Sequence, residues 1–202
     1  MVNCSGGKNW KMKRDSACFY DETATSYREL YTEEQLVKYD AALKALQVPF
    51  LGIVLDVGCG QGLFLQRISA NSILRVGIDV SFGMLVEAKK VAGFVADFLC
   101  ADADHLPLRE QVFDYVFSFT LLQNMPDPSF TLCEMLRVAE TNGSVVASFP
   151  MNSRPLEETY TWFMKTNRLW AKADSDTASK DYIFLHQKTS HPLFRNSRND
   201  FN

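Results

Sequence analysis

Short apolar runs alternate along the central part of the chain with segments in which apolar residues recur at helical spacing. The runs have the length of buried strands, and they lie at 53–57, 74–79, 98–102, 112–120 and 144–149. Helical spacing predicts helices over about 62–70, from Ser81 onward as the helix cap, and over 128–138. Strands that alternate with helices in this way predict an α/β fold with a doubly wound, mostly parallel sheet.

The flanking segments carry weaker patterns. Residues 1–17 show none and are expected to be irregular, whereas tyrosines and leucines from Ser16 onward predict one or two amphipathic helices that end at Pro49, with a capping box at 32–35. Beyond Pro150 we expect a helix over 156–170, a loop over 173–180, a last strand over 182–187 and a tail. A single final strand predicts a shortened, exposed C-terminal sheet edge, to which a protein partner could add a strand.

Length and composition predict one domain. The chain has 202 residues, of which 47% are hydrophobic, enough for a sizeable core. Within a single domain over 1–202, we expect an N-terminal helical extension or lid over 1–48, a ligand-binding core over 50–150, and a helix, strand and tail over 151–202.

Charge and cysteine content limit the kinds of ligand and the cellular compartment that are expected for this protein. The net charge of −3 argues against a polyanion-binding molecule, although the basic segment 1–14 leaves contact with nucleic acid as a less favoured alternative. Five scattered cysteines without a C-x-x-C pair favour neither disulfides nor zinc, and Cys59 and Cys100 are expected to be buried. No apolar run approaches the roughly 18 residues of a membrane span, and the basic N-terminus lacks the apolar segment of a signal peptide. These features predict a cytoplasmic protein.

Three glycines follow the first predicted strand at every second position. Gly58, Gly60 and Gly62 precede a helical pattern, so they predict a turn whose backbone a ligand can approach closely at the carboxyl edge of the sheet. The spacing is G-x-G-x-G and not the G-x-G-x-x-G of dinucleotide-binding turns. A tight turn with no ligand remains the alternative for this motif alone.

Aspartates end three successive predicted strands. Asp56, Asp79 and Asp102 are expected to converge on the edge that carries the glycine turn. A carboxylate at the Asp79 position can accept both hydroxyls of a ribose, and one at the Asp102 position can accept the exocyclic amine of adenine. The turn carries no Lys, Arg, Ser or Thr for a phosphate. The pattern therefore predicts an adenosine-bearing ligand without phosphates.

Four segments together resemble a known family. The stretches 55–62, 76–81, 101–108 and 113–118 are similar, in order, to motifs of class I S-adenosylmethionine-dependent methyltransferases, and most similar to the branch of the ubiquinone- and menaquinone-biosynthesis enzymes. The resemblance covers about residues 50–150. It implies a Rossmann-like fold, S-adenosylmethionine as methyl donor, S-adenosylhomocysteine as product, and no metal.

The resemblance also implies roles for individual residues. Asp56, Gly58, Cys59 and Gly60 would surround the methionine part of the cofactor, Asp79 the ribose, Val80 and Met84 the adenine face, Asp102 and Ala103 the adenine edge, and Ser118, Phe119 and Thr120 the sulfonium region. Separately, the tyrosine-rich pattern predicts that 16–31 forms a lid, with Tyr20 or Tyr27 near the methionine end. Packing of these tyrosines on the sheet is the compatible alternative.

The residues that would face the methyl acceptor include no base. Gln123 and Asn124 follow the fourth predicted strand and can only exchange hydrogen bonds, so they are candidates for orienting the acceptor. Of the histidines, His105 is expected to be structural or exposed. A small-molecule acceptor is favoured; the alternatives are an RNA- or protein-directed enzyme with a partner subunit, or a non-catalytic cofactor-binding subunit.

Overall fold

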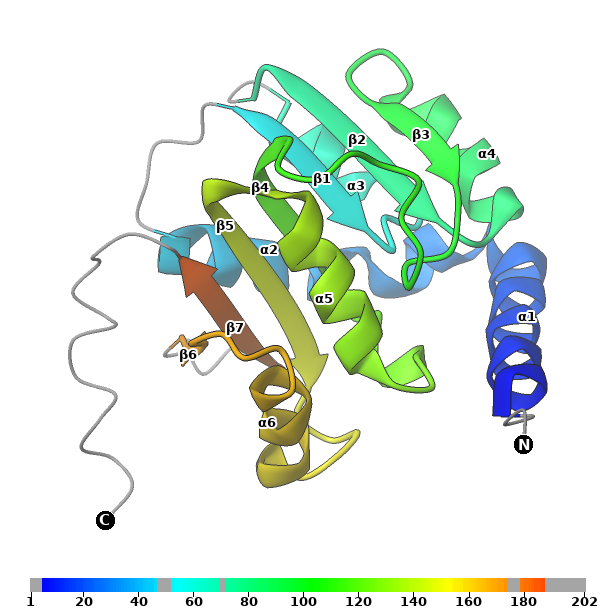
Figure 1. Ribbon diagram of the computed structural model, residues 1–202. Coiled ribbons are helices and arrows are strands. Elements are labelled where there is room, and N and C mark those ends of the chain that lie inside the picture. The colour runs from blue at the N-terminus through cyan, green and yellow to red at the C-terminus, as the bar shows by residue number, and fades with distance from the viewer. Residues whose placement is uncertain (1–4, 47–51, 70–71, 174–178, 188–202) are drawn as a thin grey trace.

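The computed structural model describes residues 5–46, 52–69, 72–173 and 179–187, in which helices cover both faces of one sheet (Figure 1). The strands are β1 (Ile53–Val57), β2 (Leu74–Asp79), β3 (Asp97–Cys100), β4 (Phe113–Ser118), β5 (Ala139–Pro150), β6 (Ala171–Lys172) and β7 (Asp181–Gln187). The helices are α1 (Ser5–Thr23), α2 (Tyr27–Leu46), α3 (Leu63–Arg67), α4 (Phe82–Ala92), the 3₁₀ turn η1 (Leu122–Asn124), α5 (Pro128–Val138) and α6 (Leu156–Met164).

The strands form one sheet in the order β3-β2-β1-β4-β5-β7-β6. Strands β1 to β5 pair in parallel, whereas β7 is antiparallel to both β5 and β6. The strand order reverses between β1 and β4, which is where open α/β sheets leave a crevice for ligands. The predicted doubly wound, mostly parallel sheet is confirmed.

Two apolar layers hold the sheet. Neighbouring residues of a strand face opposite sides, so Val54 packs with α2 and α3 while Leu55 packs with α5 and α6. The same alternation separates Val116 from Phe117 on β4. Strands buried on both faces explain why the sequence shows continuous apolar runs.

Two helix starts follow directly from their capping residues. The Ser81 hydroxyl accepts a hydrogen bond from the Met84 amide at 3.1 Å, as its position before the helical pattern predicts. Asp127 caps α5 in the same way, through the Ser129 amide at 3.1 Å. The capping box expected at 32–35 is wrong, because α2 begins at Tyr27 and those residues lie in its interior.

The structure corrects several other expectations. Segment 1–17 is helical from Ser5, α3 ends at Arg67, and α6 ends at Met164, well before residue 170. The two-residue strand β6, which the sequence did not reveal, pairs Ala171 and Lys172 with β7, so the C-terminal edge strand is present but very short. Cys59 is buried as expected, but Cys100 is exposed, because β3 is an edge strand.

Candidate functional site

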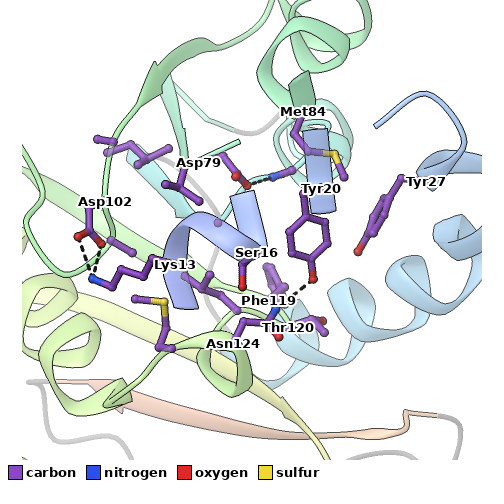
Figure 2. Close-up of a pocket in the computed structure, with 18 residues that line it drawn as sticks. Lys13, Ser16, Tyr20, Tyr27, Asp79, Met84, Asp102, Phe119, Thr120 and Asn124 are labelled. Atoms are coloured by element: carbon purple, nitrogen blue, oxygen red, sulfur yellow. Dashed lines mark hydrogen bonds and ion pairs between the residues drawn. The ribbon is translucent and has the colours of Figure 1, made fainter. Parts of the chain in front are cut away.

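A pocket opens where the carboxyl ends of the central strands meet α1 (Figure 2). It encloses about 750 Å³ of empty space, a figure that includes its open mouth. Its lining comes from α1, the start of α2, the glycine turn, the end of β2, the first turn of α4, and the segments that follow β3 and β4. The lining residues are Lys13, Ser16, Tyr20, Tyr27, Gly58, Gly60, Ile78, Asp79, Val80, Met84, Ala101, Asp102, Ala103, Phe119, Thr120, Leu121, Asn124 and Met125.

The glycine turn presents bare backbone to this pocket. Gly58, Gly60 and Gly62 have φ of 77°, 51° and 70°, a region that disfavours residues with a side chain. A Cβ at Gly60 would meet no atom within 4 Å, so this position is open toward a ligand. A Cβ at Gly62 would come within 2.8 Å of the Phe98 ring, so this glycine serves packing instead.

Asp79 joins the glycine turn to the end of β2. Its Oδ2 accepts a hydrogen bond from the Gly60 amide at 2.8 Å, and its Oδ1 accepts one from the Ser81 amide at 2.9 Å. Burial raises the pKa of Asp79, and these backbone hydrogen bonds oppose the rise. Each oxygen keeps a further lone pair for a ligand hydroxyl in the pocket.

Asp56 lies outside this pocket, in an adjoining cavity of about 380 Å³ of empty space behind the glycine turn. Cys59 lies there as well, while Gly58 and Gly60 line both spaces. Burial, together with the charge of Asp79, raises the pKa of Asp56 to about 8. Its Oδ1 is buried and has no hydrogen-bond partner among the described residues, so this carboxyl can still bind a donor.

Asp102 is held by a lysine that the sequence analysis missed. The Lys13 ammonium lies 2.7 Å from Asp102 Oδ1 and 2.5 Å from Asp104 Oδ2, and its side chain is only 9% exposed. Burial by itself raises the pKa of Asp102, but hydrogen bonds from Lys13 and the Asp104 amide outweigh it, so the pKa is lowered. His105 is 85% exposed, in line with the expectation for it.

Helical spacing explains how α1 reaches the pocket. Lys13, Ser16 and Tyr20 lie three and four residues apart, on one face of a helix, and all three line the pocket. The spacing is readable in the sequence, but only after 1–17 is known to be helical. At its other end α1 is held by Asp21, which accepts hydrogen bonds from the Ser81 hydroxyl at 2.6 Å and the Gly83 amide at 2.7 Å.

The two predicted lid tyrosines both line the pocket. The Tyr20 hydroxyl accepts a hydrogen bond from the Asn124 amide group at 3.0 Å, which joins α1 to η1. Burial raises the pKa of both tyrosines. Their rings meet edge to face with centroids 6.1 Å apart, so packing and a place at the pocket go together, as the two readings of this segment allowed.

The end of β4 separates the other predicted residues. Phe119, Thr120 and Asn124 line the pocket, whereas Ser118 is fully buried below it. Gln123 does not line the pocket either; its side-chain amide donates to the Thr120 carbonyl oxygen at 2.7 Å. Of the two candidates for orienting an acceptor, only Asn124 therefore lines the pocket.

The described residues contain neither a membrane-spanning helix nor a metal-binding cluster. No helix in the described part of the chain is long and apolar enough to cross a membrane. The same residues hold no cluster of three or more His, Cys, Asp or Glu side chains arranged for a metal ion.

Comparison with known proteins connects this geometry to a family. Residues 55–147 match the family model described as a methyltransferase domain. A malonyl-[acyl-carrier protein] O-methyltransferase from Marinomonas sp. (strain MWYL1) is 31% identical over 160 residues, covering 77% of this chain and 59% of that protein. A demethylmenaquinone methyltransferase from Thermobifida fusca (strain YX) is 28% identical over 187 residues, covering 88% of this chain and 79% of that protein.

A solved structure shares the fold. Magnesium protoporphyrin IX methyltransferase from Synechocystis PCC 6803, solved with bound S-adenosylmethionine, has a TM-score of 0.71 at 18% identity, covering 88% of this chain and 97% of that one. The chain spans less than two thirds of the malonyl-[acyl-carrier protein] relatives that it matches, 59% in the Marinomonas protein. These matches confirm the resemblance and the Rossmann-like fold predicted from the motifs.

Proposed function

We propose that this chain, a member of the class I S-adenosylmethionine-dependent methyltransferases, transfers a methyl group from that cofactor to a small-molecule acceptor. The observation that carries the proposal is the pocket at the point where the strand order reverses. There Asp79, the open backbone at Gly60 and the Phe119–Thr120 segment line one space. Names of relatives such as demethylmenaquinone methyltransferase support a small-molecule acceptor.

The chemistry of the lining fits the cofactor. Asp79 retains acceptor capacity for the ribose hydroxyls, and Val80, Met84 and Ala103 supply apolar contacts for adenine. The unpartnered Oδ1 of Asp56, next to the glycine turn, suits the ammonium of the methionine part. Asp102 remains the candidate for the adenine edge and shares its carboxylate with Lys13.

The chain's own residues then have two tasks. The bound cofactor supplies an already activated methyl group, so the protein aligns the acceptor and excludes water. Asn124 and Thr120 line the pocket and are the proposed aligning residues, and α1 with Tyr20 and Tyr27 is the proposed lid. No base is assigned, because the candidate residues after β4 exchange hydrogen bonds only.

A second candidate function is methylation of an RNA or protein with the help of a partner subunit. The two-residue edge strand β6 favours it, because β7 is longer and leaves backbone for an added strand. A non-catalytic cofactor-binding subunit would share the same pocket. We also propose that the protein is cytoplasmic.

Calorimetry and transfer assays test these functions. We expect S-adenosylmethionine and S-adenosylhomocysteine to bind, and NAD not to bind. With a radiolabelled methyl donor, label should enter the small-molecule fraction of a cell extract rather than its RNA or protein fraction. If neither S-adenosylmethionine nor S-adenosylhomocysteine binds, the proposed function is refuted. Label in RNA or protein would favour the second candidate. Binding without transfer into any fraction would favour the non-catalytic subunit.

A further inference from the structure

A buried ion pair lies directly behind the pocket. Lys38 of α2 and Asp181 of β7 are each 1% exposed, and the Lys38 ammonium lies 3.1 Å from Asp181 Oδ2. The same ammonium donates a hydrogen bond to Thr120 Oγ1 at 2.5 Å. Thr120 is thus in contact with the buried pair on one side and lines the pocket on the other.

The donor and the acceptor of each hydrogen bond around this ion pair can be assigned. The Thr120 amide donates to the Ser148 hydroxyl at 3.1 Å, and that hydroxyl donates to Asp181 Oδ2 at 2.8 Å. A lysine ammonium can only donate, so Thr120 Oγ1 must be the acceptor in its bond with Lys38. The hydroxyl hydrogen of Thr120 then remains, and among the described residues no group accepts it.

The backbone at Thr120 shows that this arrangement is imposed on it. Thr120 has φ of 56°, in the left-handed region, where a β-branched residue is an outlier. Such strain persists only where the surroundings determine the conformation, and it occurs most often at functional sites. A buried ion pair is also a poor source of net stability, so positioning of Thr120 is the better account of its presence.

Tyr20 presents a second hydroxyl of the same kind. It accepts the Asn124 hydrogen bond, so its own hydrogen is available, and burial raises its pKa so that the hydrogen is retained at neutral pH. Figure 2 shows Tyr20 and Asn124 pointing toward one another, with Thr120 in the same part of the pocket. A donated hydrogen bond from Lys38 or Asn124 strengthens each hydroxyl as a donor in turn.

We propose that the methyl acceptor presents an oxyanion to the Thr120 and Tyr20 hydroxyls, and that it is a small carboxylic acid or an acidic phenol or enol in its ionised form. The proposal rests on the proposed function. A lone pair of the oxyanion forms the new oxygen–methyl bond, while the sulfur–methyl bond breaks and its electron pair stays on sulfur. The negative acceptor and the positive sulfonium both become neutral, and no proton has to leave. An oxyanion acceptor therefore fits residues after β4 that exchange hydrogen bonds and take no proton.

Paired ligands test the charge of the acceptor. Binding is measured by calorimetry in the presence of saturating S-adenosylhomocysteine. The pairs are benzoate with benzamide, phenylacetate with phenylacetamide, and 4-nitrophenolate with 4-nitroanisole. We expect at least one acid to bind about tenfold or more tightly than its neutral partner, the effect of one or two charge-assisted hydrogen bonds. Preference in the first two pairs identifies a carboxylate site, and preference in the third a phenolate or enolate site.

Several outcomes would overturn the proposal. It fails if no acid binds more tightly than its partner, or if imidazole or a thiophenol binds more tightly than every acid. Failure of S-adenosylhomocysteine to bind would instead refute the proposed function. The two failures are therefore distinguishable.

Variants test which groups create the preference. Thr120→Val exchanges the hydroxyl for a methyl group at nearly equal volume, and we expect the acid-over-neutral ratio to fall about tenfold, with recovery in Thr120→Ser. Tyr20→Phe should lower the ratio as well. Tyr160→Phe, which removes a hydroxyl on α6 away from the pocket, is the matched control.

A paired variant tests the positioning role of the buried ions. Lys38→Met combined with Asp181→Leu removes both charges and leaves neither buried alone. If these residues position Thr120, the ratio falls in a folded variant; if they serve stability alone, the ratio is unchanged and only the melting temperature shifts. An unchanged ratio in the Thr120→Val variant would by itself contradict the assignment.

Discussion

The cavity behind the glycine turn and the α1 side of the pocket each carry an aspartate, and the two aspartates are in opposite electrostatic states. On the side of the glycine turn, Asp56 is buried without a cation, and burial raises its pKa to about 8. On the side of α1, burial acts against ionisation of Asp102 as well, but Lys13 outweighs it and the pKa is lowered. Asp56 lies near the carboxyl end of β1 and Asp102 lies just beyond that of β3, so the sequence pattern does not distinguish the two residues.

The mechanical support of the two sides differs as well. The glycine turn continues from strands whose residues form the two apolar layers, and neither layer includes any of the α1 side chains that the structure describes. Helix α1 is held by polar contacts of Lys13, Tyr20 and Asp21. We infer that the glycine turn and the strands beside it form the rigid floor of the pocket. Helix α1 is the part that opens, because locally stable regions are those with buried apolar contacts.

The largest expected effect concerns the pH dependence of stability on the floor side. Between its ordinary value of 3.8 and about 8, native Asp56 keeps a proton that the unfolded chain has released. The free energy of unfolding therefore loses nothing to Asp56 below pH 3.8. It declines as pH rises toward 8, by at most about 1.4 kcal/mol per pH unit. Asp56→Asn, which does not ionise, should flatten the decline in urea unfolding between pH 5 and pH 8.

A matched control separates Asp56 from other carboxyls. Asp97→Asn removes an exposed carboxyl on β3 and should leave the decline as it is in the unaltered protein. An equally steep decline in Asp56→Asn would show that Asp56 is ionised in the native state.

Next in size is the effect of Asp79 on cofactor affinity. Asp79→Ala removes the proposed acceptor for the ribose hydroxyls and releases the Gly60 amide. Each lost charge-assisted hydrogen bond contributes about 1.5–3 kcal/mol before water compensates, so we expect S-adenosylhomocysteine to bind about tenfold to hundredfold more weakly. Calorimetry measures this, with Asp97→Ala as the control. Unchanged affinity in a folded Asp79→Ala variant would refute the ribose assignment.

Removal of the lid should have a smaller effect on the same affinity. A chain that begins at Ala24 lacks Lys13, Ser16 and Tyr20 but keeps both apolar layers, so it should fold. We expect about tenfold weaker binding of S-adenosylhomocysteine, from loss of one wall of the pocket. Equal affinity in a truncated protein with native circular dichroism would show that α1 is not a lid.

A last effect, of about the same size, concerns opening of the lid within the full chain. Lys13→Met removes the ion pairs with Asp102 and Asp104, and hydrogen exchange of the α1 amides should become about tenfold faster, or 1.4 kcal/mol easier opening. Lys11→Met removes an exposed lysine on the same helix and is the control. Equal exchange in the two variants would mean that Lys13 does not hold α1 closed.

The sequence by itself determined the floor of the pocket. The strands at 53–57 and 74–79, the cap at Ser81 and the helix over 128–138 were predictable, because periodic apolar residues and capping side chains act over a few neighbouring positions. The positive φ of the glycine turn follows from the same local chemistry. The family motifs lie within this part of the chain.

Only the tertiary structure decided how the floor is completed. Helix α1 has little apolar periodicity, so its helical state depends on partners such as Asp102 and Asn124, about 90 to 100 residues away in the chain. The Lys38–Asp181 pair joins residues 143 positions apart, and the left-handed Thr120 between them carries no local sequence signal. Long-range polar contacts of this kind leave no period in a sequence, because each partner reads locally as an ordinary surface residue.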